Sequence, residues 1–459
     1  MEQITKPHCG ARLDRLPDCR WHSSMFAIVA FGLLVCWSNA VGGLILAQLK
    51  ALGWTDNSTT ATFSAITTAG MFLGALVGGI IGDKTGRRNA FILYEAIHIA
   101  SMVVGAFSPN MDFLIACRFV MGVGLGALLV TLFAGFTEYM PGRNRGTWSS
   151  RVSFIGNWSY PLCSLIAMGL TPLISAEWNW RGQLLIPAIL SLIATALAWR
   201  YFPESPRWLE SRGRYQEAEK VMRSIEEGVI SQTGKPLPPV VIADDGKAPQ
   251  AVPYSALLTG VLLKRVILGS CVLIAMNVVQ YTLINWLPTI FMTQGINLKD
   301  SIVLNTMSMF GAPFGIFIAM LVMDKIPRKT MGVGLLILIA VLGYIYSLQT
   351  SMLLITLIGF FLITFVYMYV CYASAVYVPE IWPTEAKLRG SGLANAVGRI
   401  SGIAAPYAVA VLLSSYGVTG VFILLGAVSI IVAIAIATIG IETKGVSVES
   451  LSIDAVANK

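Results

Sequence analysis

Two charged signatures each occur twice along the chain. The stretch DKTGRR at residues 83–88 recurs as DKIPRK at residues 324–329, an offset of 324 minus 83, or 241. The stretch EYMPGRNRG at residues 138–146 recurs as EIWPTEAKLRG at residues 380–390, an offset of 380 minus 138, or 242. Carboxylates beside guanidinium groups form ion pairs that break and re-form when the elements carrying them move. The nearly equal offsets indicate that the chain consists of two versions of one unit.

The elements that carry these signatures are predicted to be membrane-spanning helices. Hydrophobic residues make up 56% of the 459 positions and charged residues 12%, against roughly 25% charged in soluble domains, and the mean hydropathy is +0.72. This composition excludes a water-soluble globular protein. Apolar runs of about 20 residues, enough to cross roughly 30 Å of hydrocarbon as an α-helix, recur along the chain. We expect an all-α membrane protein with twelve spans, at residues 24–46, 62–82, 89–107, 112–134, 148–170, 183–202, 266–291, 302–322, 330–347, 354–377, 388–414 and 418–440.

The net charge of +8 is explained by the orientation of these spans. Lys and Arg residues concentrate in every second loop, and the loops between them carry few bases. By the positive-inside rule the basic loops are cytoplasmic, which places both termini in the cytoplasm. We therefore expect a lipid bilayer as the partner of this basic protein and no nucleic acid. The basic loops are at residues 84–88, 143–145, 207–265, 325–329 and 387–389.

A polar segment separates two sets of six spans. Within it, residues 211–227 carry apolar side chains at helical spacing, which predicts an amphipathic helix on the cytoplasmic face. Residues 235–253 are rich in Pro, Gly and Asp and are predicted to be a flexible linker. No small-residue cleavage site follows the first apolar run, so we expect no cleaved signal peptide. The expected organisation is an N-terminal segment at 1–23, a six-helix bundle at 24–202, a cytoplasmic loop at 203–265, a second six-helix bundle at 266–440 and a cytoplasmic tail at 441–459.

Short motifs along the chain carry a resemblance to a known family. GIIGDKTGRR at residues 79–88 resembles the signature between the second and third helices of the major facilitator superfamily, and PESPRWL at residues 203–209 resembles a specific motif of its sugar-porter branch. The resemblance covers nearly the whole chain, and within the branch the chain is similar to bacterial inner-membrane metabolite transport proteins. It implies two six-helix bundles that enclose a solute site near the membrane midplane. Three further segments resemble motifs of the same branch: RFVMGVGLG at 118–126, PEIWPTEAKLRG at 379–390 and ETKG at 442–445.

The resemblance assigns the recurring charged residues to a cytoplasmic gate. Their ion pairs would hold the outward-open state and break as the two halves rock. The alternative is a set of charged loops that only fixes membrane topology, but recurrence in both halves favours the gate. The expected gate residues are Asp83, Arg87, Arg88, Glu138, Arg145, Asp324, Arg328, Glu380 and Arg389.

Arg118 and Glu95 are charged side chains inside predicted spans. An unpartnered cation there costs about 2.5 to 3.5 kcal/mol on insertion scales, so such residues indicate function. In the proton-coupled sugar porters that the chain resembles, the Arg matching Arg118 faces an Asp on the first span. Ser38 stands at that position here, so the resemblance does not predict proton symport by that exchange. Glu95, one helical turn from His98, is predicted either to carry protons or to be a structural partner of an Arg.

Polar and aromatic side chains on the spans that line the central cavity of this fold are candidates for binding a substrate. Amides both donate and accept hydrogen bonds, which suits a neutral or hydroxylated solute, although each amide could instead bridge helices. Several sugar contacts of the family are replaced, by Ala275, Met276, Ala312 and Ala375, so a plain hexose is not predicted. The candidates are Asn39, Asn157, Asn277, Gln280, Asn285, Trp286, Tyr372 and Asn395.

The predicted function is uptake of a small polar metabolite across the bacterial inner membrane. The substrate would be sugar-like, a sugar derivative or a sugar acid, and protons would drive its uptake by a monomer without a cofactor. Export, facilitative transport and a solute sensor that does not transport are the alternatives. The exporter signature of the fifth span is missing from residues 156–169, which disfavours drug export. With three His, no metal-ligand cluster and no nucleophile motif, the sequence offers no catalytic site.

Overall fold

The computed structural model describes residues 7–17, 19–35, 40–140, 145–240, 253–383 and 386–444. Within these ranges the regular secondary structure is α-helical, with one short π-helical stretch. A chain in hydrocarbon must satisfy its backbone hydrogen bonds internally, and a helix does so within a single segment. The prediction of an all-α membrane protein is therefore confirmed for the described part of the chain.

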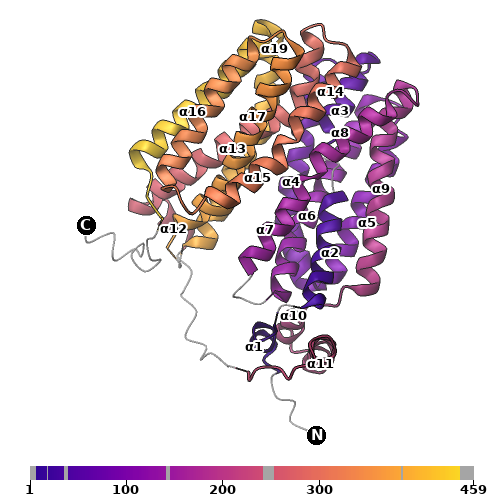
Figure 1. Ribbon diagram of the computed structural model, residues 1–459, viewed down its shortest axis with the longest axis vertical. Coiled ribbons are helices and arrows are strands. Elements are labelled where there is room, and N and C mark those ends of the chain that lie inside the picture. Colours follow the sequence, from indigo (N-terminus) through magenta and orange to yellow (C-terminus); the bar gives the residue numbers. More distant parts are fainter. Residues whose placement is uncertain are drawn as a thin grey trace.

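The helices fall into two groups separated by a polar connection (Figure 1). The first group contains α2 (Arg20–Val35), α3 (Gly42–Ala51), α4 (Asn57–Thr85), α5 (Arg87–Ala106), α6 (Met111–Tyr139), α7 (Arg145–Asn157), α8 (Ser159–Leu170) and α9 (Ala176–Tyr201). The second group contains α13 (Gly260–Thr293), α14 (Leu298–Met309), α15 (Gly311–Val322), α16 (Arg328–Ser347), α17 (Met352–Cys371), the π-helical η1 (Tyr372–Tyr377), α18 (Val378–Glu380) and α19 (Lys387–Ile439). The remaining helices are α1 (Cys9–Asp14), α10 (Pro206–Ser211), α11 (Tyr215–Thr233) and α12 (Tyr254–Leu257).

Nine helical segments of the described residues are long and apolar enough to cross a membrane. Two other predicted spans are each divided into two shorter helices, the first into α2 and α3 and the fifth into α7 and α8. The last two predicted spans both lie in α19, which bends at Gly417 (φ 64°, ψ −159°). This backbone conformation favours glycine because a Cβ atom would clash there.

Side-chain caps fix where several of these helices begin. Asp56 accepts a hydrogen bond from the Thr59 N–H at 2.7 Å at the start of α4. Asn110 caps α6 in the same way, through an N–H at 2.9 Å, and Asn297 caps α14, also at 2.9 Å. Each cap satisfies a backbone donor that the first helical turn leaves unpaired.

Close helix packing through glycine is repeated in the two groups. In the first group, a Cβ atom on Gly74 of α4 would lie 2.1 Å from the Val123 carbonyl oxygen of α6. In the second group, a Cβ atom on Gly315 of α15 would lie 2.3 Å from the Thr364 carbonyl oxygen of α17. Because only glycine lets two backbones approach this closely, the shared packing supports the internal repeat found in the sequence.

The two groups contact each other at the end of the molecule that contains α3, α8 and α14 (Figure 1). We call this the sealed end, and we call the end that carries residues 83–88 and 324–329 the basic end. A Cβ atom on Gly43 of α3 would lie 2.4 Å from the Ile284 carbonyl oxygen of α13, so the two backbones nearly touch. Two hydrogen bonds also join the groups, from Asn57 Nδ2 to Ser414 Oγ at 2.8 Å and from Asn305 Nδ2 to Ser164 Oγ at 3.1 Å.

A small helical cluster lies beyond the basic end, formed by α1, α10 and α11 (Figure 1). We call this cluster the cap. The amphipathic helix predicted at residues 211–227 is found as α11, and its apolar residues pack against α1 and α10. Helix α1 has no counterpart in the sequence prediction, and ion pairs from Arg12 to Glu219 and Glu226 join it to α11. Residues 241–252 of the predicted linker lie outside the described residues.

Candidate functional site

In the first half of the chain, Arg87 lies between two carboxylates at the basic end. Its Nη1 atom is 2.7 Å from Asp83 Oδ1, and its Nη2 atom is 2.8 Å from Glu138 Oε1. Glu138 also accepts a hydrogen bond from the Ser205 hydroxyl. The backbone N–H of Arg87, at the start of α5, donates to Glu204 Oε1 at 2.7 Å. A carboxylate at this position is stabilised by the partial positive charge of the helix N-terminus.

The second half repeats the arrangement around Arg328. Its Nε atom is 3.0 Å from Glu380 Oε2, and its Nη2 atom is 3.2 Å from Asp324 Oδ1. Glu380 also accepts a hydrogen bond from the Thr443 hydroxyl at 2.6 Å. The backbone N–H of Arg328, at the start of α16, donates to Glu442 Oε1 at 2.8 Å. Each of these four contacts therefore has an equivalent in the first half.

Sequence reasoning missed the part that Glu204 and Glu442 take in these networks. Both residues lie in motifs that the sequence singles out, PESPRWL and ETKG. Both occupy the N-terminus of a helix that begins with a predicted gate arginine. A second acidic motif in each half was the signal that could have identified them.

The remaining predicted gate residues are Arg88, Arg145 and Arg389. The guanidinium of Arg88 donates to the Trp199 carbonyl oxygen. The Arg389 guanidinium lies 5.1 Å from the centre of the Tyr254 ring. The side chain of Arg145 lies outside the described part of the structure. The ion pairs of Arg87 join residues of the first half and those of Arg328 join residues of the second, so the two networks are separate in this conformation.

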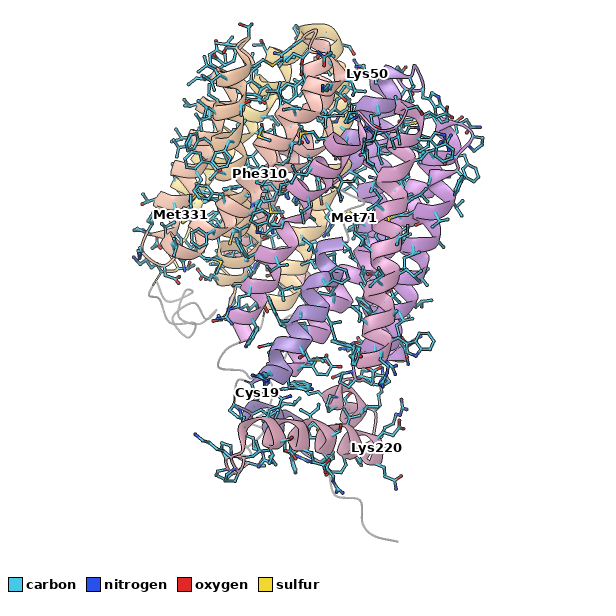
Figure 2. The ribbon with its side chains drawn as sticks, turned by 45° about the vertical axis from the view of Figure 1, so that its right-hand side comes forward. Cys19, Lys50, Met71, Lys220, Phe310 and Met331 are labelled. Carbon is cyan, nitrogen blue, oxygen red and sulfur yellow. The ribbon has the colours of Figure 1, made fainter. Side chains whose placement is uncertain are left out.

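A cavity of about 240 Å³ lies between the two halves. Helices of the first group contribute most of its lining, and α13 and α19 of the second group contribute the rest. Met71, one of the lining residues, lies at mid-height between Lys50 near the sealed end and Lys220 in the cap (Figure 2). The apolar lining residues are Leu33, Met71, Leu125 and Leu129. The others are Ser153, Gly156, Asn157, Ser159, Tyr160, Gln280, Tyr281 and Arg399.

Two of the eight predicted substrate-binding residues, Asn157 and Gln280, line this cavity. Four others do not line it and are buried elsewhere, namely Asn277, Asn285, Trp286 and Tyr372. Asn277 donates to the Leu273 carbonyl oxygen of its own helix at 2.7 Å, and Tyr372 stacks on Tyr377 with ring centres 5.0 Å apart. Asn395 is exposed and donates to the Ser391 carbonyl oxygen. Asn39 lies outside the described residues.

The cavity also contains residues that sequence reasoning missed, above all Tyr160, Tyr281 and Arg399. The signal for Arg399 was present, because it lies inside the predicted span at 388–414 and a cation inside a span indicates function. The same criterion identifies Arg118 in the sequence. The tyrosines had no such signal, since aromatic residues occur on every face of membrane helices.

Arg118 is 1% exposed and lies outside the cavity lining. Its Nε atom donates to Thr67 Oγ1 at 3.2 Å, and its guanidinium lies 4.6 Å from the centre of the Phe63 ring. A Cβ atom on Gly42 would lie 3.1 Å from Arg118 Nη2 and 3.0 Å from Asn285 Oδ1. Arg118 is therefore next to the contact between the two halves.

Glu95 and His98 form a fully buried pair on α5. Glu95 Oε2 lies 3.8 Å from His98 Nδ1, and neither residue lines the cavity. The backbone of Gly124 on α6 packs against His98, since a Cβ atom there would lie 3.1 Å from the His98 amide nitrogen. The pair is thus held in the α5–α6 contact.

Comparisons with known proteins bear on both the fold and the site. A family model of the Major Facilitator Superfamily matches residues 25–406. The chain is 44% identical to the inner membrane metabolite transport protein YdjE of Escherichia coli, covering 98% of this chain and 99% of that protein. It is 25% identical to the niacin transporter NiaP of Acinetobacter baylyi, covering 96% and 99%. Its fold is similar to an inward open structure of the xylose transporter XylE from Escherichia coli, with a TM-score of 0.74 and 16% identity over 94% and 99% of the two chains.

Proposed function

We propose that this chain, which belongs to the major facilitator superfamily, is a secondary active transporter of a small polar metabolite in the bacterial inner membrane. The observation that carries this proposal is a central cavity lined from both halves, beside a set of contacts that closes one end. A solute in such a cavity reaches one side of the membrane at a time if the halves rock about it. The similarity to an inner membrane metabolite transport protein supports this localisation and class.

The proposed topology has twelve spans in two six-helix bundles, at residues 24–202 and 266–440. It counts α2 with α3 as one span, α7 with α8 as another, and divides α19 at Gly417. The basic end would face the cytoplasm by the positive-inside rule, and the cap and both termini would lie on that side. This conformation would then be open toward the cytoplasm, because Asn57–Ser414 and Asn305–Ser164 join the two halves at the sealed end.

The two charged networks would form the cytoplasmic gate. Each arginine is held by carboxylates of its own half, so each half presents a preorganised set of charges at the basic end. When the halves tilt so that the sealed end opens, the basic ends approach each other and the two networks would contact. The outward-open state would be stabilised by that contact and released when it breaks.

Uptake would be driven by protons that bind at Glu95. Glu95 is fully buried beside His98 in the α5–α6 contact, and a change of charge there would alter the energy of that contact. The hydroxyl and amide groups of Asn157, Gln280 and the two tyrosines suit a substrate with several polar groups.

Substrate binding and counterflow together test this proposal. Purified protein is first screened by thermal shift against sugars, sugar acids and polyols, because a ligand that binds the native state raises its stability. The compounds that bind are then tested for counterflow in proteoliposomes loaded with unlabelled compound. We expect transient accumulation of labelled substrate. Binding without counterflow would indicate a solute sensor and would contradict the proposal.

A further inference from the structure

Arg399 is the one charged residue among the described residues that line the central cavity. It lies 399 minus 387, or 12, residues after the start of α19, which corresponds to about 18 Å at about 1.5 Å per residue. This depth is near the middle of a hydrocarbon layer of roughly 30 Å. Its neighbours Gly398 and Gly402 pack against Leu273 and Tyr281 of α13, which fixes the rotation of α19 at this point.

Among the described residues, the Arg399 guanidinium lacks the compensation that Arg118 and Arg328 have. Its Nη1 atom is buried and has no hydrogen-bond partner among the residues that the structure describes. By contrast, Arg118 donates to a threonine hydroxyl, and Arg328 pairs with Glu380. None of the described residues that line the cavity is acidic. The side chain therefore places a positive charge in the cavity without a carboxylate beside it among the residues that the structure describes.

This charge is costly when the cavity loses its water. An arginine is effectively always protonated in proteins, so the site cannot become neutral by releasing a proton. An unpartnered arginine is unfavourable inside a membrane helix. An anion that enters the cavity removes this cost, whereas a neutral solute leaves it in place. A carboxylate suits the guanidinium best, because it accepts two parallel hydrogen bonds.

The size and composition of the cavity restrict the anion further. Its volume of about 240 Å³ corresponds to about eight water-sized groups at about 30 Å³ each. One positive charge balances a monoanion and leaves a phosphate dianion with an excess negative charge. Four apolar side chains can contact a hydrocarbon body, while Asn157, Gln280 and the tyrosines Tyr160 and Tyr281 can hydrogen-bond its polar substituents.

We propose that the substrate is a small organic monocarboxylate and that its carboxylate pairs with Arg399. This proposal rests on the proposed transport function and narrows its substrate class. Arg399 is then the residue that selects acids over their neutral analogues, and Asn157 and Gln280 recognise the body of the molecule.

The test compares matched acid and neutral compounds on purified full-length protein. The probes are benzoate with benzamide, 4-hydroxybenzoate with 4-hydroxybenzamide, and gluconate with sorbitol. Binding is measured by thermal shift and by titration for wild type, Arg399→Gln, Arg399→Lys and Arg151→Gln. Arg151 is a matched control because it lies on the cavity helix α7, is exposed and does not line the cavity.

We expect acids to bind and their neutral partners to bind at least tenfold more weakly. Arg399→Gln should weaken acid binding at least tenfold, Arg399→Lys should weaken it less, and Arg151→Gln should leave it unchanged. The unliganded Arg399→Gln protein should melt at the same temperature as wild type or higher, since no protein partner is lost. Equal binding of acids and neutral partners would overturn the proposal, as would unchanged acid binding by Arg399→Gln. Counterflow of sorbitol without counterflow of any acid would also overturn it while leaving the transport function intact.

Discussion

Arg328 Nε lies 3.0 Å from Glu380 Oε2, and this pair reproduces in the second half the contact of Arg87 with Glu138 in the first. The side chain of Arg328 is only 6% exposed. Its carboxylate partner is therefore needed to compensate a largely buried charge. The repetition indicates that both halves use the same chemistry at the basic end.

Glu380→Gln should reduce counterflow at least tenfold while leaving membrane insertion intact. The substitution removes a negative charge that pairs with the largely buried guanidinium of Arg328. Removing one partner of a fully buried ion pair costs about 3 to 5 kcal/mol, and we expect a smaller cost for this partly exposed pair. Transport rates in proteoliposomes, normalised to the amount of folded protein, measure the effect. Glu177→Gln is the matched control, because Glu177 pairs with Arg181 in a more exposed contact at 3.5 Å. Wild-type transport by Glu380→Gln would remove this pair from the gate.

Gly43→Leu should prevent closure of the sealed end. A Cβ atom at this position would lie 2.4 Å from a backbone oxygen of α13, a distance that side chains do not tolerate. We expect transport to fall at least tenfold. Because the sealed end would stay open, a cysteine that replaces Ser153 in the cavity should react with thiol reagents added on the outer side of the membrane. Gly79→Leu is the control, since a Cβ atom there meets nothing within 4 Å. If the cavity of Gly43→Leu stays closed to external reagents, the assignment of the sealed end is wrong.

Glu95→Gln should make transport independent of the external pH. Wild-type uptake is expected to rise as the outside becomes more acidic, because protonation of Glu95 accompanies substrate entry. Gln resembles the protonated acid and cannot release a proton, so accumulation against a gradient should be lost while counterflow persists. An unaltered pH response in Glu95→Gln would show that protons bind elsewhere.

The cap should lose stability in acid through Glu226. Burial alone would raise the pKa of this carboxyl, but hydrogen bonds from Arg12 and Arg15 outweigh it, so the pKa lies below its ordinary value. A carboxyl whose pKa is lower in the folded state stabilises that state above its unfolded pKa of about 4.3 to 4.5. That stabilisation is lost as the pH falls through the lower, folded pKa.

Glu226→Gln mimics the acid effect at neutral pH. Loss of a charged hydrogen-bond acceptor costs about 1.5 to 3 kcal/mol, which corresponds to roughly tenfold to 150-fold faster local opening. We expect amide hydrogen exchange in α1 to accelerate by that factor and exchange in α16 to stay unchanged. Glu217→Gln, at an exposed pair with Arg214, is the control. Equal protection of α1 in Glu226→Gln and wild type would contradict the role of this carboxylate.

The sequence was informative about features that depend on local composition and much less about side-chain direction. Apolar runs indicate spans because the thickness of the hydrocarbon layer sets the length of a membrane helix. Basic loops indicate the orientation of the spans because Lys and Arg residues concentrate in cytoplasmic loops. Arg87 and Arg328 were identified because their motifs recur. The separation of their networks depends on how the halves are tilted, which no local pattern reports.

Within the cavity, the rotation of each helix decides which residues face the solute. Asn277 and Gln280 lie on the same predicted span, yet only Gln280 lines the cavity. A helix turns about 100° per residue, so side chains three residues apart point only about 60° apart. The packing of Gly398 against Asn277 occupies that amide, and Gln280 faces the cavity. Such contacts between distant segments cannot be read from one sequence.

Cross-linking the sealed end tests alternating access most directly. Asn57 and Ser414 belong to different halves and are hydrogen-bonded at 2.8 Å. In a protein whose seven native cysteines are replaced, Asn57→Cys and Ser414→Cys are joined in proteoliposomes by a short, reducible thiosulfonate cross-linker. We expect counterflow to stop in proportion to cross-linking, to return after reduction, and to be unaffected in either single variant. Undiminished counterflow by fully cross-linked protein would contradict the proposal that the two halves separate at this end.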